Sequence, residues 1–220
     1  MFHDRQEAGQ RLAAELSKLG LAEPVVLALP RGGVPVAIEI AGALKAPLDL
    51  VIVRKVGAPG NPELAAAAIV DGNPPDIVLN YEIVEALDLD EDDLRVLIDR
   101  ERPELARRRH VYLGERQPLA IVGKTAIIAD DGMATGATMK VAIQALRRRS
   151  PRLIVVAVPV APPEVIAGLS LAADRVVCLS QPTRFLALSY HYRTFRQLED
   201  EDVLSMLREY SLPASPPPLR

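Results

Sequence analysis

The stretch TAIIADDGMATGATM, from Thr125 to Met139, decides the fold predicted for this chain. Its apolar run Ala126–Ala129 is typical of a strand that is buried on both faces, and it delivers two aspartates to the end of that strand. Glycines, threonines and small apolar residues follow, and a helical pattern begins near Ala137. The stretch therefore predicts a strand, a tight loop and a helix in direct succession.

The same order of strand and helix extends to both sides of this stretch. Buried strands are predicted at Val25–Leu29, Leu48–Val53, Thr125–Ala129, Leu153–Val158 and Arg175–Leu179. Helices are predicted at Asp4–Leu19, Val34–Leu44, Thr138–Arg149 and Pro163–Leu171. Because crossovers between parallel strands are nearly always right-handed, this alternation predicts an α/β fold with a doubly wound parallel sheet flanked by helices. Ligands bind at the carboxyl ends of the strands in such folds.

The section between the second and third predicted strands breaks this rhythm. VGAPGN (Val56–Asn61) is a Gly/Pro-rich loop that could move as part of a lid, and Ile77–Leu79 is a short strand. A highly charged helical pattern covers Glu91–Val111, in which Pro103 predicts a kink or break. We expect this charged section to cover a site rather than to join the core of the sheet.

Length and composition place the chain among ordinary globular proteins. Its 220 residues predict one domain over residues 1–212, with residues 57–119 as a lid or hood insertion and residues 213–220 as a disordered tail. The net charge of −3 gives no reason to expect nucleic acid or an anionic membrane as a partner. The basic runs at residues 107–109 and 147–149 are interpreted as solvated helix faces. With no apolar signal region and no bilayer-spanning segment, we expect a cytoplasmic protein.

The loop after the third strand has the chemistry of a phosphate site beside a diol site. Small residues let backbone N–H groups converge at a helix N-terminus, and two threonine hydroxyls add donors, which suits a phosphate dianion. Asp130 and Asp131 are good acceptors for two vicinal hydroxyls. Together these features predict a ribose 5-phosphate site. The alternatives are an ordinary strand-turn-helix with a capping threonine, or an acidic pair that holds a metal as in a phosphatase or receiver domain.

At these residues IIADDGMATGAT resembles the PRPP-binding signature of the type I phosphoribosyltransferases, PRPP being 5-phosphoribosyl 1-diphosphate. The resemblance implies the type I phosphoribosyltransferase fold with a small helical hood. It also implies that Asp130 and Asp131 hold the ribose 2- and 3-hydroxyls. The PRPP-binding loop after them would comprise Gly132, Met133, Ala134, Thr135, Gly136, Ala137 and Thr138.

The same resemblance extends to the pyrophosphate half of PRPP. The turn Leu29–Gly33 (LPRGG) follows the first strand and resembles the family's pyrophosphate loop, in which Arg31 and Gly32 would contact the leaving group. A non-proline cis peptide bond of this loop would lie near Arg31-Gly32. Of the two basic residues after the second strand we favour Lys55 over Arg54 as a second cation.

A catalytic set of Asp130, Asp131, Arg31 and Lys55 is implied by this resemblance, with Mg²⁺ bound mainly through PRPP and no metal ligand assigned to the protein.

The acceptor is left open by the sequence. Phe185 and Tyr192 are the predicted acceptor-binding residues, because an aromatic at the Phe185 position stacks on the base in the purine enzymes that this segment resembles. Ala134 stands where 6-oxopurine enzymes carry a catalytic aspartate. Glu63, Tyr192 and His191 are the remaining candidates for an acid–base group.

A group of bacterial phosphoribosyltransferases without an assigned acceptor resembles the chain more closely still. The shared segments are Asp4–Leu12, Val53–Ala65 and Tyr192–Gln197. The function implied is transfer of ribose 5-phosphate from PRPP to a nitrogenous base or similar small nucleophile, with release of pyrophosphate. The alternative is a non-catalytic regulatory protein that binds PRPP. A homodimer is the family expectation.

Overall fold

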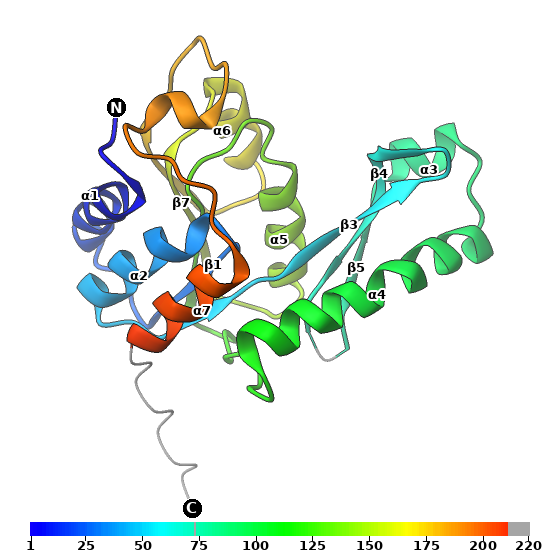
Figure 1. Ribbon diagram of the computed structural model, residues 1–220, viewed down its shortest axis with the longest axis horizontal. Coiled ribbons are helices and arrows are strands. Elements are labelled where there is room, and N and C mark those ends of the chain that lie inside the picture. The colour runs from blue at the N-terminus through cyan, green and yellow to red at the C-terminus, as the bar shows by residue number, and fades with distance from the viewer. Residues whose placement is uncertain (73, 211–220) are drawn as a thin grey trace, which may run out of the picture.

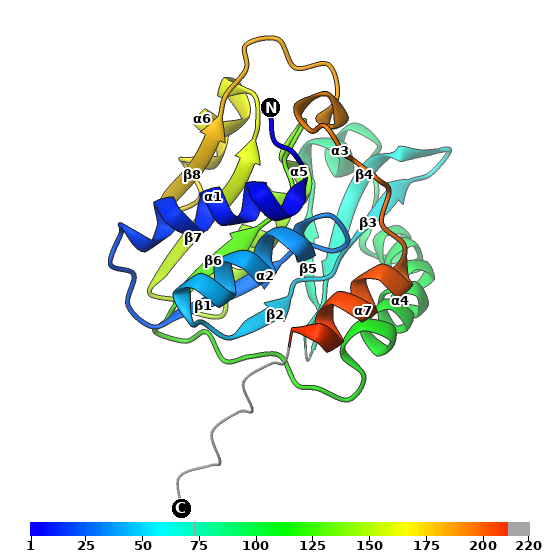
Figure 2. The same cartoon turned by 60° about the vertical axis from the view of Figure 1, so that its left-hand side comes forward.

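A parallel sheet of five strands forms the centre of the computed structural model, which describes residues 1–72 and 74–210 apart from the side chains of residues 62 and 63. The strand order is β2 (Leu48–Leu50), β1 (Pro24–Ala28), β6 (Thr125–Ala129), β7 (Leu153–Val160) and β8 (Arg175–Ser180). Figure 1 shows the sheet at the centre of the larger part of the molecule, and Figure 2 labels its five strands. The parallel register places the last residues of β1 and β6, Ala28 and Ala129, opposite each other, and β7 continues beyond Ala157, the partner of Ala129, to Val160. The prediction of an α/β fold with a doubly wound parallel sheet is confirmed.

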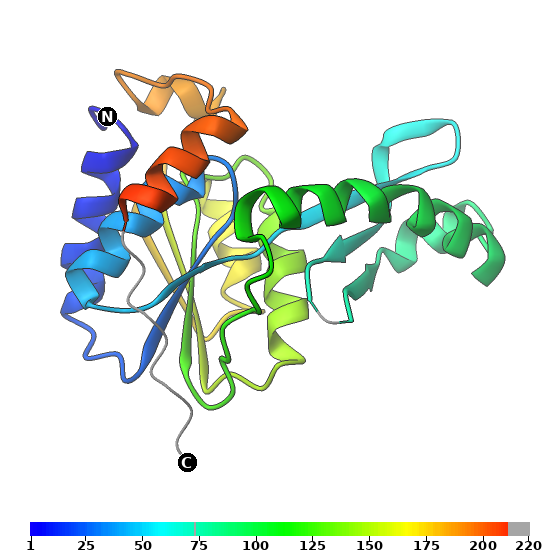
Figure 3. The same ribbon diagram turned by 60° about the horizontal axis from the view of Figure 1, so that its bottom comes forward.

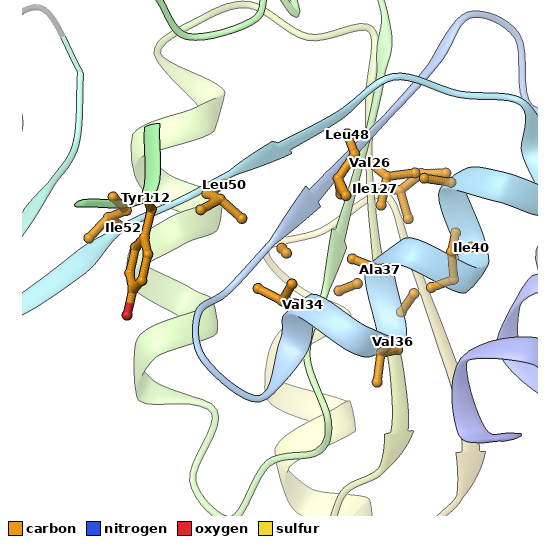
Figure 4. Packing of buried hydrophobic residues seen from close by; sticks show 14 of the residues in the cluster. Val26, Val34, Val36, Ala37, Ile40, Leu48, Leu50, Ile52, Tyr112 and Ile127 are labelled. Atoms are coloured by element: carbon orange, nitrogen blue, oxygen red, sulfur yellow. The ribbon is translucent and has the colours of Figure 1, made fainter. Parts of the chain in front are cut away.

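Helices cover both faces of this sheet, so its strands alternate between two apolar layers (Figure 2). The helices α1 (Arg5–Ser17) and α2 (Gly33–Leu44) lie on one face, and α5 (Ala137–Arg147) and α6 (Pro163–Leu169) lie on the other. Facing α2 are side chains such as Val26, Leu48 and Ile127, which Figure 4 shows against Val34, Ala37 and Ile40. Because neighbouring residues such as Val25 and Ile128 face α5 instead, the inner strands β1, β6 and β7 carry apolar side chains on both faces.

A small antiparallel sheet leaves the central one, in the strand order β3 (Val53–Ala58), β4 (Asn61–Val70) and β5 (Asp76–Leu79). The single strand predicted at Leu48–Val53 is therefore wrong: β2 ends at Leu50, and the chain passes into β3 at Val53. The prediction of a loop at VGAPGN is also wrong. These residues form the end of β3 and its turn into β4, with Gly60 at a φ of +73°. The apolar run continues from one sheet into the other, so its pattern contains no sign of the change.

Two helices complete the inserted section, α3 (Tyr81–Ala86) and α4 (Glu91–Leu113). Figure 3 shows α4 lying along the small sheet as one continuous helix. The predicted kink or break at Pro103 did not end the helix: α4 continues ten residues beyond it, to Leu113. Leu94, Ile98 and Leu105 hold α4 against the core on both sides of this proline, and this packing compensates for the missing N–H.

Buried ion pairs attach the inserted section to the central sheet. Arg109 of α4 binds the carboxylate of Asp71, which is 6% exposed, and Arg149 donates to the Asp71 carbonyl oxygen. Arg116, just after α4, lies 3.4 Å from the Asp49 carboxylate in β2. The interpretation of both basic runs as solvated faces is thus wrong for Arg109 and Arg149, because each side chain turns inward to a buried acceptor.

The C-terminal segment returns across the carboxyl end of the central sheet. It includes a short 3₁₀-helix at Leu188–His191 and the helix α7 (Asp200–Glu209), which packs near α2 and α4 (Figure 3). Phe2 pairs with Tyr192 there, so the N-terminus meets the C-terminal segment, and the Tyr192 hydroxyl donates to Asp131 of the loop after β6. No helix in residues 1–72 or 74–210 is long and apolar enough to cross a bilayer. The tail predicted at residues 213–220 lies outside the described residues.

Candidate functional site

The loops after β1 and β6 meet at the carboxyl edge of the central sheet. Leu29 N–H donates to the Ala129 carbonyl oxygen at 3.0 Å, which fixes the two loops at their bases. A Cβ atom at Gly32 would stand 2.2 Å from Asp131 Oδ2, so this carboxylate lies directly on the glycine backbone. Because a side chain at residue 32 would displace Asp131, the close approach of the predicted pyrophosphate and ribose loops requires glycine there. The cis peptide bond of the first loop joins Pro30 to Arg31, one bond before the predicted place.

The loop of residues 132–138 turns from β6 into α5 and leaves part of its backbone exposed. Gly136 caps α5 at a φ of +68°, a conformation that favours glycine. Ala134 and Thr135 are exposed, and among the described hydrogen bonds their amides donate to no protein acceptor. Exposed amides at the N-terminus of an 11-residue helix suit a phosphate dianion.

Met133 departs from the predicted phosphate contact. Its side chain is buried, and its N–H donates to the Val160 carbonyl oxygen at 3.0 Å. Its amide is therefore bonded to the neighbouring strand and is not free to donate to a phosphate, whereas the other residues of the predicted PRPP-binding loop stay a prediction.

Asp131 forms a nearly buried ion pair that no pattern in the sequence predicts. Arg5, at the start of α1, donates from Nε to Asp131 Oδ2 at 2.7 Å, and the two side chains are 11% and 9% exposed. The guanidinium lies 3.9 Å from the ring centroid of Phe195 and also donates to the Arg196 carbonyl oxygen at 2.8 Å. Arg5 thus connects the first helix, the C-terminal segment and the predicted ribose-binding carboxylate.

Burial governs the protonation of the two aspartates. It raises the pKa of Asp130 well above the ordinary value, and the neighbouring Asp131 raises it further. Burial also raises the pKa of Asp131, although the Arg5 cation opposes this effect. The Asp131 N–H donates to Asp130 Oδ1 at 2.9 Å, which holds the first carboxyl in place. A ligand with a positive charge or with hydroxyl donors would favour the ionised form of this pair.

Arg31 extends from the first loop toward α7. Its Nη1 lies 2.9 Å from Glu199 Oε2 and 3.7 Å from Asp200 Oδ1 at the N-terminus of that helix. Asp200 also accepts from the Tyr112 hydroxyl of α4. Arg31, the cation predicted to bind pyrophosphate, is therefore paired with two carboxylates here, and both lie on the C-terminal segment.

Lys55 lies on β3, in the small sheet, and not at the end of a strand of the central sheet as predicted. Its exposed side chain lines a cavity of about 650 Å³, together with Pro30 of the first loop and Thr138 at the start of α5. The structure therefore brings Lys55 to the same cavity as residues of both predicted PRPP loops. Arg54 has a different role, since its Nε lies 2.6 Å from Glu101 Oε2 of α4.

The two predicted acceptor-binding residues lie in different surroundings. Phe185 is half-buried and stacks on His191, with ring centroids 5.0 Å apart and planes at 24°. Tyr192 is 4% exposed, packs between Phe2 and Phe195, and donates from its hydroxyl to the Asp131 carbonyl oxygen at 2.6 Å. This burial argues against contact between Tyr192 and an acceptor and assigns it to supporting the loop.

The donors at the site fit a magnesium ion held mostly by its substrate. The described residues contain no group of three or more His, Cys, Asp or Glu side chains placed to hold a metal. Asp130 and Asp131 supply carboxylate oxygens, and Mg²⁺ commonly takes one or two such ligands and completes its shell with phosphate oxygens and water.

The side chain of Glu63, a candidate acid–base group, lies outside the part of the chain that is described.

Known proteins resemble this chain over most of its length. Residues 2–170 match the family model of the phosphoribosyl transferase domain. Proteins of two Mycobacterium tuberculosis strains, provisionally named phosphoribosyl transferases, are 42% identical over 207 residues, which is 94% of this chain and 46% of theirs. The chain thus spans about half the length of these relatives. The crystal structure of TT1426 from Thermus thermophilus is 44% identical, with a TM-score of 0.85 over 96% of this chain and 99% of that one.

Proposed function

The chain belongs to the phosphoribosyl transferase domain family, and from this premise we propose that it transfers ribose 5-phosphate from PRPP to a nitrogenous base or a similar small nucleophile, with release of pyrophosphate. The arrangement that supports this most directly is the meeting of the two loops, where Asp131 lies on the backbone of Gly32. PRPP carries its pyrophosphate on C1 of the ribose, the carbon next to the one that carries the 2-hydroxyl. A ribose-binding carboxylate and a pyrophosphate-binding loop must therefore be neighbours.

Asp130 and Asp131 accept hydrogen bonds from the ribose hydroxyls in the proposed reaction. As the bond to pyrophosphate breaks, positive charge develops at the anomeric carbon, and two nearby carboxylates stabilise that charge. The exposed amides of Ala134 and Thr135 hold the 5-phosphate at the start of α5. When bound, Mg²⁺ would neutralise charge on the departing pyrophosphate, and Asp130 and Asp131 are the residues that would contact it.

In this proposal, cations from two parts of the chain neutralise the negative charge of the departing pyrophosphate. Lys55 faces the shared cavity from the small sheet, and Arg31 belongs to the loop after β1. Because Arg31 is paired with Glu199 and Asp200 without substrate, pyrophosphate competes with these carboxylates for it. The positive charge of Arg31 is thus neutralised by Glu199 and Asp200 until PRPP binds.

The acceptor is proposed to contact the segment around Phe185, whose half-buried ring offers a flat apolar surface. No carboxylate stands at position 134, so an acceptor that loses a proton must transfer it elsewhere. We therefore do not assign the base beyond a small nucleophile with a nitrogen atom.

Two measurements on the purified chain test the proposed function. Titration calorimetry with PRPP and Mg²⁺ is expected to give saturable binding, and binding is expected to be lost in Asp130→Asn/Asp131→Asn. A screen of purines, pyrimidines and simple amines for acceptor-dependent release of pyrophosphate is expected to identify the acceptor. A folded chain that does not bind PRPP contradicts the proposal. PRPP binding without turnover for any acceptor favours the alternative of a regulatory PRPP-binding protein.

A further inference from the structure

The cavity that contains Lys55 is walled on one side by the inserted helix α4. Figure 3 shows α4 lying beside β3, and the cavity of about 650 Å³ opens between them. From α4 it is lined by Arg100, Glu101 and Arg108, and from the core by Pro30 and Thr138. The site is thus shared between the central sheet and the inserted section.

The lining of this cavity is strongly positive. Among the side chains that the structure describes, it contains the basic ones of Arg54, Lys55, Arg100 and Arg108 and the acidic one of Glu101. Arg54 is paired with Glu101 at 2.6 Å, and Arg108 is paired with Glu104 at 2.8 Å.

Two of these cations remain without a carboxylate. Among the described residues, Lys55 and Arg100 form no ion pair, and both side chains are exposed. Two such cations in one cavity favour a ligand with more than one negative charge, because a multivalent anion can accept from both.

We propose that Arg100 of α4 binds the pyrophosphate end of PRPP together with Lys55, an inference that rests on the proposed function. Pro30 belongs to the loop after β1 and Thr138 to the loop after β6, so a PRPP molecule held by both loops faces this cavity. Arg31 is meanwhile paired with Glu199 and Asp200. The inserted section thus contributes a substrate-binding residue besides covering the site.

Arg100→Gln and its control Arg102→Gln test this assignment. Arg102 lies on the same helix, pairs with Asp99 at 2.8 Å and does not line the cavity. Calorimetry with magnesium pyrophosphate, PRPP and ribose 5-phosphate is the measurement. Arg100→Gln is expected to lower the affinity for pyrophosphate and for PRPP about tenfold, which corresponds to the loss of roughly one charged hydrogen bond. The affinity for ribose 5-phosphate is expected to stay unchanged. Arg102→Gln is expected to bind all three as the wild type does.

Several outcomes would overturn the assignment of Arg100. One is wild-type affinity of Arg100→Gln for pyrophosphate, and another is an equal loss for pyrophosphate and ribose 5-phosphate. A higher KM for an acidic acceptor with unchanged pyrophosphate binding would move Arg100 to the acceptor site, and would also overturn it. If the wild type binds pyrophosphate through Arg100 but does not bind PRPP, the proposed function fails while the anion site stands.

Discussion

Asp130 is more costly to ionise than an ordinary aspartate because desolvation and the neighbouring Asp131 both raise its pKa. Its folded-state pKa is raised, so the folded chain holds this proton more tightly than the unfolded chain does. The resulting stability is complete below the unfolded pKa of about 3.9 and is lost as the pH rises through the raised folded value. Above the unfolded pKa the raised folded value therefore costs the free protein stability, and a bound ligand that favours the ionised form offsets that cost.

Asp130→Asn is accordingly expected to stabilise the free protein at neutral pH while it removes PRPP binding. Asparagine retains an oxygen that can accept from the Asp131 N–H, and each unit of pKa shift is worth about 1.4 kcal/mol. In a chain of this size ~1 kcal/mol moves Tm by about 2–4 °C, and the expected change in Tm is a rise. The rise should shrink toward pH 4. Thermal unfolding from pH 4 to 8 measures both effects, and a fall in Tm at pH 7 would contradict them.

Arg5 is expected to control the protonation of Asp131. The charged and titratable groups that face Asp131 are Arg5 of α1, Asp130 of its own loop and the Tyr192 hydroxyl. Arg5→Gln removes the only cation of this set, so the pKa of Asp131 rises and the acid limit of PRPP binding moves to higher pH. Loss of one partner of a nearly buried pair also costs on the order of 3–5 kcal/mol of stability.

The pH profile of PRPP binding separates this positioning role from a merely structural one. Arg11→Gln is the matched control, because Arg11 lies on the same helix over the ring of Phe2 and is 52% exposed. The pH profile of PRPP binding by Arg11→Gln is expected to match that of the wild type. Arg5→Lys is expected to recover part of the binding that Arg5→Gln loses. If Arg5→Gln binds PRPP with the wild-type pH profile, Arg5 only supports the fold.

At the scale of elements, α4 is fastened to the central sheet by its last turns. Arg109 pairs with the buried carboxylate of Asp71, whose pKa burial raises although Arg109 opposes the effect. Arg109→Gln leaves this carboxylate without its partner and is expected to cost on the order of 3–5 kcal/mol. Urea unfolding measures the loss, and Arg109→Gln/Asp71→Asn should recover part of it.

Arg95→Gln is the control on the same helix, since Arg95 is 70% exposed and its pair with Asp92 is superficial. It is expected to change stability by less than about 0.5 kcal/mol. Hydrogen exchange should also show faster opening of α4 in Arg109→Gln than in Arg95→Gln. Equal stability of the two variants would mean that the Asp71 pair does not fasten the helix.

For the whole molecule, ligand binding is expected to join two parts that are distant along the chain. The proposed PRPP site takes Asp130 and Asp131 from the central sheet and Lys55 and Arg100 from the inserted section. Magnesium PRPP should therefore slow hydrogen exchange both in the loop after β6 and in α4, and should raise Tm because it binds only the folded chain. Protection confined to the central sheet would contradict the shared site. The expected homodimer stays a prediction, which light scattering can test.

Much of the architecture, and the meeting of the two loops predicted to bind PRPP, follow from the sequence alone. Continuous apolar runs at β1, β6 and β7 predicted strands buried on both faces, and their alternation with helices predicted the parallel sheet. In such a sheet all carboxyl ends lie at one edge, so the loops at Arg31 and Asp131 had to be neighbours. These are local patterns combined with one rule of topology, and local patterns are what a sequence displays directly.

Only the tertiary structure decided which distant side chains meet. The apolar run Leu50–Val53 continues from the central sheet into β3, so the change of sheet that places Lys55 on the inserted section leaves no trace in its periodicity. Arg5 and Asp131 are 126 positions apart, and no spacing rule relates them. Periodicity reports the burial of each residue but not its partner. The pairing of Asp131 with Arg5, and the convergence of Arg100 with Lys55 on one cavity, arise only when the elements pack.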